Sequence, residues 1–382
     1  MADLRTKYVG LDLRSPIIAA SSGITETVER MKKAEDRGVG AVVMKTLFEE
    51  AVTRIAPSPR FRVIRHNLGM DKTFSLYSYE QASEWGPERY GDEIVKAKKE
   101  LSIPVIASIN CVTDEGWVNY ARKMEEAGAD ALELNVSCPH SSITFSGDEV
   151  EKRIFETVKL VKSNVSLPVI PKLSPQLTTP LHMVKNLEKI GINGVVLFNR
   201  LTGLEIDIEK EEPVMHGGYA GHGGPWAIQY ALRWISEISH HVKIDISGSG
   251  GVGSGEDVVK YILSGATTIQ VCTAIVMRGY EVITQFNKEL EEFMTQKGYT
   301  EIEDFKGKVT KKILGTEEID RVHRVKAWID KDRCSGCSLC YKVCIYSAVK
   351  PEEGKYRILE ICDGCGLCVE VCPKGAIKMG CS

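Results

Sequence analysis

Cysteine is scarce in the first 333 residues of this 382-residue chain, where only Cys111, Cys138 and Cys272 occur. The other nine of the twelve cysteines lie in residues 334–382. A secreted protein of this size stabilised by disulfides would not gather its cysteines at one end. The crowded segment therefore predicts a metal-binding module, in a protein of a reducing compartment.

Three further kinds of segment are missing. Residues 1–16 contain no long apolar stretch of the kind found in signal peptides. No apolar run approaches the roughly 18–20 residues that are needed to span a bilayer. The formal net charge is −3 and no basic block occurs, which argues against a nucleic-acid partner. We therefore expect a cytoplasmic protein that binds neither membrane nor nucleic acid.

Short apolar runs alternate with longer amphipathic segments through residues 1–300. Eight runs read as buried strands: 16–20, 40–44, 103–109, 131–135, 168–173, 194–198, 242–246 and 268–271. Helical periodicity is clearest at 114–128, 149–164, 254–264 and 279–295. This alternation is typical of parallel strands with helical crossovers, and eight units in about 300 residues predict an α/β fold, the closed (β/α)8 TIM barrel. An open doubly wound sheet is the alternative, but its G-x-G-x-x-G fingerprint does not follow the first strand.

Polar residues follow the predicted strands, at the end of the barrel where active sites are built. Those expected on this rim are Ser21, Ser22, Gly23, Lys45, Thr46, Asn110, Asn135, Ser137, Lys172, Asn199 and Arg200. Any one of them could be a turn residue, but their recurrence in phase with the strands predicts a site. After the last two strands, Gly250-Gly251 and Thr273-Ala274 are suited to binding the phosphate of a cofactor.

Cys138 is the candidate for chemistry, because it alone of the three barrel cysteines is expected to end a strand. A thiol can act as a general acid or base near neutral pH. Nucleophilic catalysis is the alternative, although no supporting triad is evident. The following polar stretch, Ser141–Val150, could act as a lid, and Cys272 is expected in the core of the last strand.

The cysteines after residue 333 form a repeated motif. C-x2-C-x2-C-x3-C begins at Cys334 and recurs 28 residues later at Cys362. This is the spacing of two-cluster bacterial ferredoxins, in which the fourth cysteine of each motif ligates the other cluster. The expected [4Fe–4S] ligand sets are Cys334, Cys337, Cys340 and Cys372, and Cys362, Cys365, Cys368 and Cys344. Zinc would favour wider gaps. We expect a barrel over 1–300, a connecting segment over 301–327 and this ferredoxin-like α+β domain over 328–382.

Several segments resemble the FMN barrels of the dihydroorotate dehydrogenase-like family. They are 16–23, 133–140, 171–175, 198–199 and 249–252. The segment 270–274, His140 after the Cys-Pro pair and the two-cluster tail make the chain similar to the catalytic subunit of bacterial NAD-dependent dihydropyrimidine dehydrogenases. Three departures concern the substrate. The segment 110–117 is shorter than in that branch and lacks its asparagine at the matching place, Arg200 stands where a threonine is expected, and the segment 74–80 differs from either branch.

The resemblance implies a role for each rim residue. FMN would bind with its phosphate at Gly250-Gly251 and Thr273-Ala274, Lys45 and Lys172 at its ring and ribityl chain, and Ser21, Ser22, Gly23 and Thr46 beside it. Asn110, Asn135, Ser137, Asn199 and Arg200 would contact substrate. Cys138 would protonate C5 of a pyrimidine such as uracil or thymine while FMN N5 delivers hydride to C6.

Other interpretations stay open at this point. Arg200 suits the carboxylate of an anionic substrate such as dihydroorotate, or it turns outward to pair with Glu205 or Asp207. The barrel could also be the scaffold of an electron-transfer subunit. Because no dinucleotide fingerprint with its acidic partner occurs, a flavoprotein that oxidises NAD(P)H, or a ferredoxin, is the expected partner, and a homo-oligomer is expected.

Overall fold

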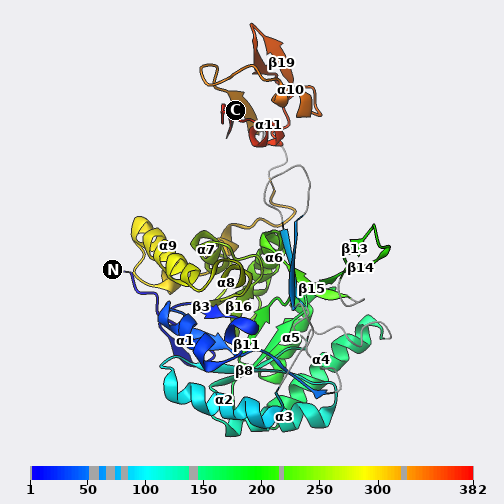
Figure 1. Cartoon of the computed structure of the whole chain (residues 1–382). Helices are drawn as coiled ribbons and strands as arrows, with labels where there is room; N and C mark the ends of the chain where they lie inside the picture. The colour runs from blue at the N-terminus through cyan, green and yellow to red at the C-terminus, as the bar shows by residue number, and fades with distance from the viewer. Residues whose placement is uncertain are drawn as a thin grey trace. The chain divides into compact units, whose positions relative to one another are not determined.

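The computed structural model describes residues 2–50, 60–65, 74–78, 85–136, 145–214, 219–319 and 325–381. Ser137, Cys138 and residues 141–144 of the expected lid lie outside these ranges. The chain forms two compact units, Met1–Ile313 and Leu314–Ser382, which are described separately (Figure 1). Residues 301–313, expected in a connecting segment, belong to the first unit, where Ile302 and Phe305 are buried.

Within the described residues, eight parallel strands close into a barrel by the pairing of β4 with β8, which confirms the predicted TIM barrel. In barrel order they are β3 (Ile17–Ala19), β4 (Ala41–Val43), β8 (Val105–Asn110), β9 (Ala131–Leu134), β10 (Val169–Leu173), β11 (Gly194–Leu197), β16 (Asp245–Ser249) and β17 (Thr268–Val271). A ninth strand, β5 (Leu47–Phe48), adds to β8. Strand β16 begins three residues later than predicted, because Val242 and Ile244 pack against the core ahead of the strand.

Helices surround the barrel (Figure 1). They are α1 (Val28–Asp36), α2 (Pro87–Glu100), α3 (Asp114–Glu126), α4 (Gly147–Lys162), α5 (Pro180–Ile190), α6 (Ile228–Ile238), α7 (Gly255–Leu263), α8 (Thr273–Arg278) and α9 (Glu281–Lys297). The four sequence-predicted helices are α3, α4, α7 and α9. Ser146 and Glu149 form a capping box at the start of α4, so residues 147–150 of the expected lid are its first turn.

The amino-terminal hairpin fills one end of the barrel. Strands β1 (Thr6–Tyr8) and β2 (Leu11–Leu13) are antiparallel, and Tyr8, Val9 and Leu13 form one buried cluster with inward residues of six barrel strands. Those inward residues are Ile18, Ala41, Val43, Ile106, Ala131, Ile170 and Val196. The hairpin covers the amino ends of these strands, so the polar rim for a site is expected at their carboxyl ends.

A small antiparallel sheet follows the carboxyl ends of the barrel strands. Its order is β12 (Leu201–Gly203), β15 (Ala220–Gly223), β7 (Phe74–Ser78) and β6 (Phe61–Arg65). A separate pair, β13 (Ile206–Asp207) and β14 (Glu212–Pro213), lies between β12 and β15 in the sequence. Strand β12 starts directly after Arg200, so this sheet adjoins the expected substrate rim.

The second unit shows the duplication seen in the cysteine motif. Strand β18 (Val325–Ile329) pairs with β21 (Ile377–Cys381), and β19 (Val349–Glu352) pairs with β20 (Lys355–Ile358). The short helices α10 (Leu339–Val343) and α11 (Leu367–Glu370) each follow the second cysteine of a motif. Positive φ recurs at positions 28 residues apart: Gly336 and Gly364, Ser338 and Gly366, and Ser347 and Gly375.

In the part of the chain that the structure describes, no helix combines the length and apolar character required to cross a membrane.

Candidate active site

Two cavities of similar size lie in the second unit. One is lined by Cys362, Cys365, Cys368 and Cys344, and the other by Cys334, Cys337, Cys340 and Cys372. These are the two groups of four expected from the motif spacing. Within the described residues no three ligating side chains are placed to hold a single metal ion. The spacing of the two cysteine motifs is that of cluster ligands, whereas zinc sites favour wider gaps.

The fourth cysteine of each motif is held in the same way. The backbone N–H of Ala348 points to Cys344 Sγ and that of Ala376 to Cys372 Sγ, both at 3.3 Å. Backbone N–H groups directed at a cysteine sulfur stabilise the negative charge of a thiolate. The two cavities are therefore equivalent in backbone support as well as in their thiols.

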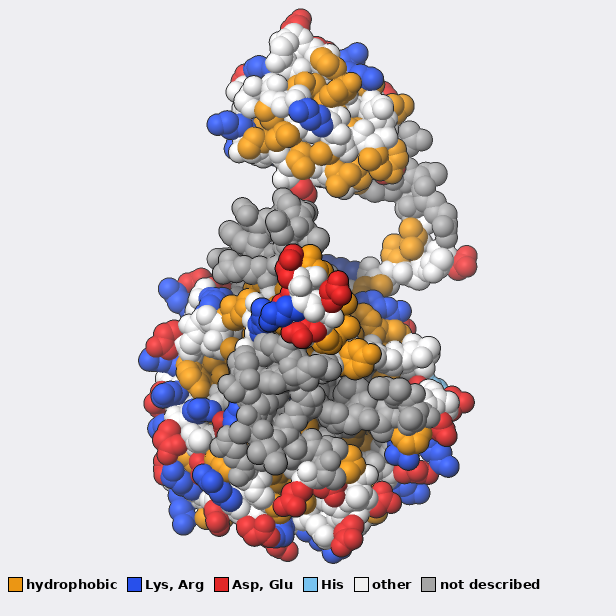
Figure 2. All heavy atoms as spheres, turned by 45° about the vertical axis from the view of Figure 1, so that its right-hand side comes forward, with side chains coloured by type: hydrophobic (Ala, Val, Ile, Leu, Met, Phe, Trp, Pro, Cys, Tyr) orange, Lys and Arg blue, Asp and Glu red, His pale blue; other side chains and the backbone are white. Residues whose placement is uncertain are grey.

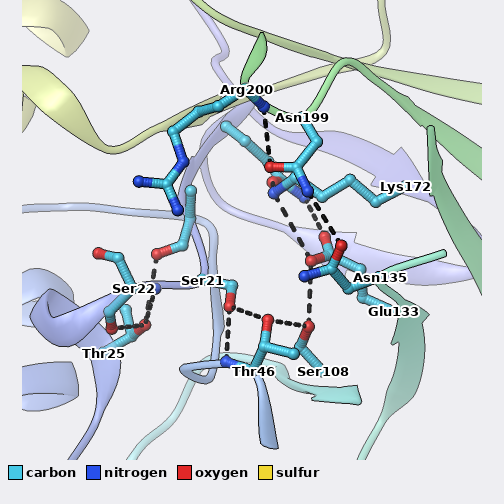
Figure 3. Close-up of polar contacts among 12 residues, drawn as sticks. Ser21, Ser22, Thr25, Thr46, Ser108, Glu133, Asn135, Lys172, Asn199 and Arg200 are labelled. Carbon is cyan, nitrogen blue, oxygen red and sulfur yellow. Dashed lines mark hydrogen bonds and ion pairs between the residues drawn. The ribbon is translucent and has the colours of Figure 1, made fainter. Parts of the chain in front are cut away.

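In the barrel, a chain of hydroxyl groups runs along the inner wall from the rim (Figure 3). Ser21 Oγ and Thr46 Oγ1 are 2.8 Å apart, and Thr46 Oγ1 and Ser108 Oγ are 2.9 Å apart. The backbone N–H of Thr46 also donates to Ser21 Oγ at 2.8 Å. Ser21 and Thr46 are thus brought together, whereas the Ser22 hydroxyl accepts from Ile24 N and caps the turn that starts at Gly23.

A buried ionic network continues from this chain. Ser108 Oγ donates to Glu133 Oε1 at 3.3 Å, and Gln270 Nε2 donates to Glu133 Oε2 at 2.7 Å. Lys172 Nζ donates to Gln270 Oε1 at 2.7 Å and lies 3.6 Å from Glu133 Oε1. Lys172 lies inside β10 rather than after it, so its side chain starts within the barrel. Lys45, two residues beyond β4, is also buried.

Three strand-end asparagines meet at the rim. Asn110 Nδ2 donates to the backbone oxygen of Asn135 at 2.7 Å, and Asn199 Nδ2 donates to Asn135 Oδ1 at 2.9 Å. Asn110 Oδ1 is buried and has no hydrogen-bond partner among the described residues. A buried acceptor without a donor is costly, so this atom is suited to an N–H group of a bound molecule.

Arg200 follows Asn199 and is half-buried. Its backbone N–H donates to Asn199 Oδ1 at 2.9 Å, and its side chain lies over Gly221 and Gly223 of β15, where an added Cβ would be 3.3–3.7 Å from it. Within the described ranges its guanidinium makes no ion pair, whereas the Asp207 carboxylate accepts from the backbone of Glu209 and Lys210. The outward pairing with Glu205 or Asp207 is therefore not formed.

The turns after β16 and β17 have the geometry expected of a phosphate site. Gly250 and Gly251 have φ of 112° and 72°, a region that favours glycine, and Tyr261 Oη donates to Gly250 O at 2.6 Å. A Cβ on Gly251 would lie 2.6 Å from Ile228 N, so only glycine fits. Thr273 and Ala274 are the first residues of α8, which directs backbone N–H groups to the same rim.

Strand position does not single out Cys138. Cys111 directly follows β8, and Cys272 is half-buried between β17 and α8 rather than inside the last strand, so two expectations about these cysteines were wrong. Burial separates Cys111 from Cys272: Cys111 is buried, and this burial, with the charge of Glu49 adding to it, raises the pKa of its thiol. Cys111 is therefore protonated at neutral pH and has the properties of a core residue.

Ser108, Glu133 and Gln270 are central to the site, yet rim positions alone did not identify them. The signal was present: each is a polar residue inside a short apolar strand, and Ser108 and Glu133 precede Asn110 and Asn135 by two positions. Since side chains two apart on a strand share a face, an inward rim residue implies an inward residue one layer below.

Comparisons with known proteins agree with this geometry. Residues 3–294 match the dihydroorotate dehydrogenase family, and residues 327–379 match a 4Fe-4S dicluster domain. The NAD-dependent dihydropyrimidine dehydrogenase subunit PreA of Escherichia coli is 28% identical over 355 residues, 90% of this chain and 85% of that protein. The dihydroorotate dehydrogenase B (NAD(+)) catalytic subunit of Thermoplasma acidophilum is 33% identical over 311 residues, 80% of this chain and 99% of that protein.

FMN and two [4Fe–4S] clusters are the cofactors of this architecture, and the chain is an oxidoreductase of the type that acts on CH–CH bonds. The residues fit them: a glycine turn that no Cβ could enter, a buried acceptor, Asn110 Oδ1, with no partner among the described residues, and two cavities of four thiols each. The chain belongs to the dihydroorotate dehydrogenase family, with a 4Fe-4S dicluster domain at its carboxyl-terminal end.

Proposed function

We propose that the chain interconverts a pyrimidine, such as uracil or thymine, and its 5,6-dihydro form. The amide cluster of Asn110, Asn135 and Asn199 carries this proposal, because a pyrimidine presents alternating N–H and C=O groups that amides can pair with. The chain's similarity to the dihydropyrimidine dehydrogenase subunit, which extends over both units, supports the same substrate class.

The residues divide the reaction between two faces of the substrate ring. FMN, when bound, supplies or accepts the hydride at C6. Asn135 and Asn199 hold the amide edge of the ring, Lys45, Lys172, Ser21, Ser22 and Thr46 lie toward the cofactor, and Gly250, Gly251, Thr273 and Ala274 bind its phosphate. Cys138 donates a proton to C5 in reduction and removes it in oxidation, so that two electrons and two protons are transferred in each turnover.

We further propose that the two groups of four cysteines ligate the clusters and that the clusters connect FMN with a partner protein. The partner is a flavoprotein subunit that oxidises NAD(P)H, or a ferredoxin. The names of the two relatives, one a subunit and the other a catalytic subunit, support an enzyme that works with a second chain.

A second candidate substrate is an anionic relative such as dihydroorotate, and Arg200 favours it. A half-buried guanidinium that makes no ion pair among the described residues, and that directly follows Asn199, can bind a carboxylate through two parallel hydrogen bonds. Similarity to the dihydroorotate dehydrogenase catalytic subunits points in the same direction.

An anaerobic titration of the purified holoenzyme separates the two candidates. Dihydrouracil, dihydrothymine and dihydroorotate are added in turn, and bleaching of the oxidised flavin is followed by absorbance. We expect the neutral dihydropyrimidines to bleach it, and the variant Arg200→Thr to leave this response unchanged. If dihydroorotate alone bleaches it and Arg200→Thr abolishes the response, the anionic candidate replaces the first. If none does, the proposed reaction is wrong.

A further inference from the structure

The interior of the barrel contains a carboxylate that the proposed reaction does not use. Glu133 on β9 is 1% exposed, and both of its oxygens are occupied. Oε2 accepts from Gln270 Nε2 at 2.7 Å, and Oε1 accepts from Ser108 Oγ at 3.3 Å. A buried carboxylate is tolerated only where a charge partner and hydrogen bonds replace its hydration.

The charge partner of Glu133 is Lys172. Lys172 Nζ lies 3.6 Å from Glu133 Oε1, and the two groups are also joined through Gln270, whose Oε1 accepts from Lys172 Nζ at 2.7 Å. The Gln270 amide thus faces the ammonium with its oxygen and the carboxylate with its nitrogen. Residues from β9, β10 and β17 form a triangle with no net charge.

The triangle fixes the position of the Lys172 ammonium. A lysine side chain has four rotatable bonds, and without an anchor its ammonium would move toward water. Here Gln270 and Glu133 hold it inside the barrel, and the hydroxyl chain of Ser108, Thr46 and Ser21 links Glu133 to the rim. Ser108 on β8 is therefore part of the same network as Lys172 on β10, although one strand lies between them.

We propose that Glu133 is a positioning residue that anchors Lys172 and offsets its charge, and that it thereby sets the reduction potential of the bound flavin. The inference depends on the proposed location of Lys172 beside the flavin ring. Two-electron reduction adds negative charge to that ring, so an unbalanced ammonium nearby favours the reduced form, and the Glu133 carboxylate opposes this effect. Glu133 thus keeps the flavin a stronger reductant than Lys172 alone would allow.

The test is the two-electron midpoint potential of the flavin in the Glu133→Gln holoenzyme, measured anaerobically against a reference dye by flavin absorbance. Glutamine retains the size and a hydrogen-bonding oxygen but removes the charge. We expect the reduced form to be favoured at least tenfold relative to the unsubstituted enzyme, a shift of about 30 mV to more positive potential. An unchanged potential in a flavin-loaded Glu133→Gln protein overturns the proposal.

Glu35 provides a matched control. Like Glu133 it is buried, 4% exposed, and it accepts from a serine, Ser102, while pairing with a lysine, Lys32, at 2.6 Å. It lies on α1, on the outside of the barrel. Glu35→Gln should lower the melting temperature and leave the flavin potential unchanged. An equal shift in this variant would show that Glu133→Gln acts through stability alone, and would overturn the proposal.

Two further variants keep the outcomes distinct. Lys172→Met should move the potential in the negative direction; if it has no effect, Lys172 is not beside the flavin, and that part of the proposed function falls together with the inference. Glu133→Asp retains the charge but is one methylene shorter, so its potential should lie between those of the unsubstituted enzyme and Glu133→Gln. If Glu133→Gln does not fold, the sign of the Glu133→Asp shift decides: a positive shift supports the charge-offsetting role of Glu133, and no shift or a negative one excludes it.

Discussion

The barrel cysteines show how a residue's surroundings, rather than its place in the sequence, determine its chemistry. Cys111 and Cys272 directly follow barrel strands, as rim residues do, yet Cys111 is buried in the core cluster. Burial raises the pKa of its thiol, which makes it a poor acid or base at neutral pH. Cys138 lies outside the described residues, and its role in proton transfer is proposed from its sequence motif alone.

Replacing Cys138 by alanine tests this assignment. We expect FMN to remain bound, because none of the residues proposed to hold it is changed, and turnover to fall by about 10²–10⁴-fold, the usual contribution of a general acid or base. Flavin absorbance of the desalted protein measures binding, and steady-state oxidation of the dihydropyrimidine measures turnover.

The matched control is Cys111→Ala, which removes a buried thiol of the same barrel. It should lower stability, as other cavity-forming core substitutions do, while turnover stays near normal. Near-normal turnover in Cys138→Ala, or an equal loss in both variants, would contradict the role of Cys138.

At the scale of the element, patterns of apolar residues predicted the barrel well and its boundaries less well. The eight strands and four of the helices follow from alternating apolar runs, because burial on both faces of parallel strands leaves a clear signature. The predicted start of strand β16 was three residues too early, because Val242 and Ile244 pack against the core although they precede the strand. The Glu133–Gln270–Lys172 triangle was missed because side chains from three separated strands meet there, and a single sequence does not specify which inward residues touch.

The turn after β16 can be tested as an element in its own right. Gly251→Ala places a Cβ at φ 72° and 2.6 Å from the backbone nitrogen of Ile228. Left-handed strain alone costs about 1–2 kcal/mol, and the contact with α6 adds to it. We expect a lower melting temperature and a loss of bound FMN, measured by thermal unfolding and by the ratio of flavin to protein.

Gly191 at the end of α5 separates these two effects. It has φ 87°, but an added Cβ would meet nothing within 4 Å. Gly191→Ala should therefore show the strain without the loss of flavin. If both variants retain FMN equally, the turn after β16 does not hold the phosphate.

The whole molecule joins a flavin barrel to a dicluster unit that exposes several large apolar side chains. In Figure 2 hydrophobic side chains are visible on this unit, and Ile345, Ile361 and Trp328 are 74%, 62% and 48% exposed. Residues 314–382 contain lysines and arginines in nearly the same number as acidic residues. Recognition of an electron carrier by this unit would therefore depend little on long-range attraction, and its rate should vary only weakly with ionic strength.

The route by which electrons enter the enzyme can be tested with two kinds of electron donor. The glycine turn after β16 lacks an acidic residue about 20 positions later, which a dinucleotide-binding fingerprint requires, and it is expected to bind the FMN phosphate instead. The isolated holoenzyme should therefore reduce a pyrimidine when supplied with a reduced viologen dye, which delivers single electrons, but not when supplied with NADH. The assay follows loss of pyrimidine absorbance under anaerobic conditions with equal reducing equivalents of each donor.

Adding an NADH-oxidising flavoprotein partner should restore the NADH-dependent rate, because the partner converts the hydride of NADH to single electrons, which the clusters can accept. Equal rates with NADH and with the viologen, in the absence of any partner, would show that the barrel accepts hydride directly and that the dicluster unit is not the entry point for electrons.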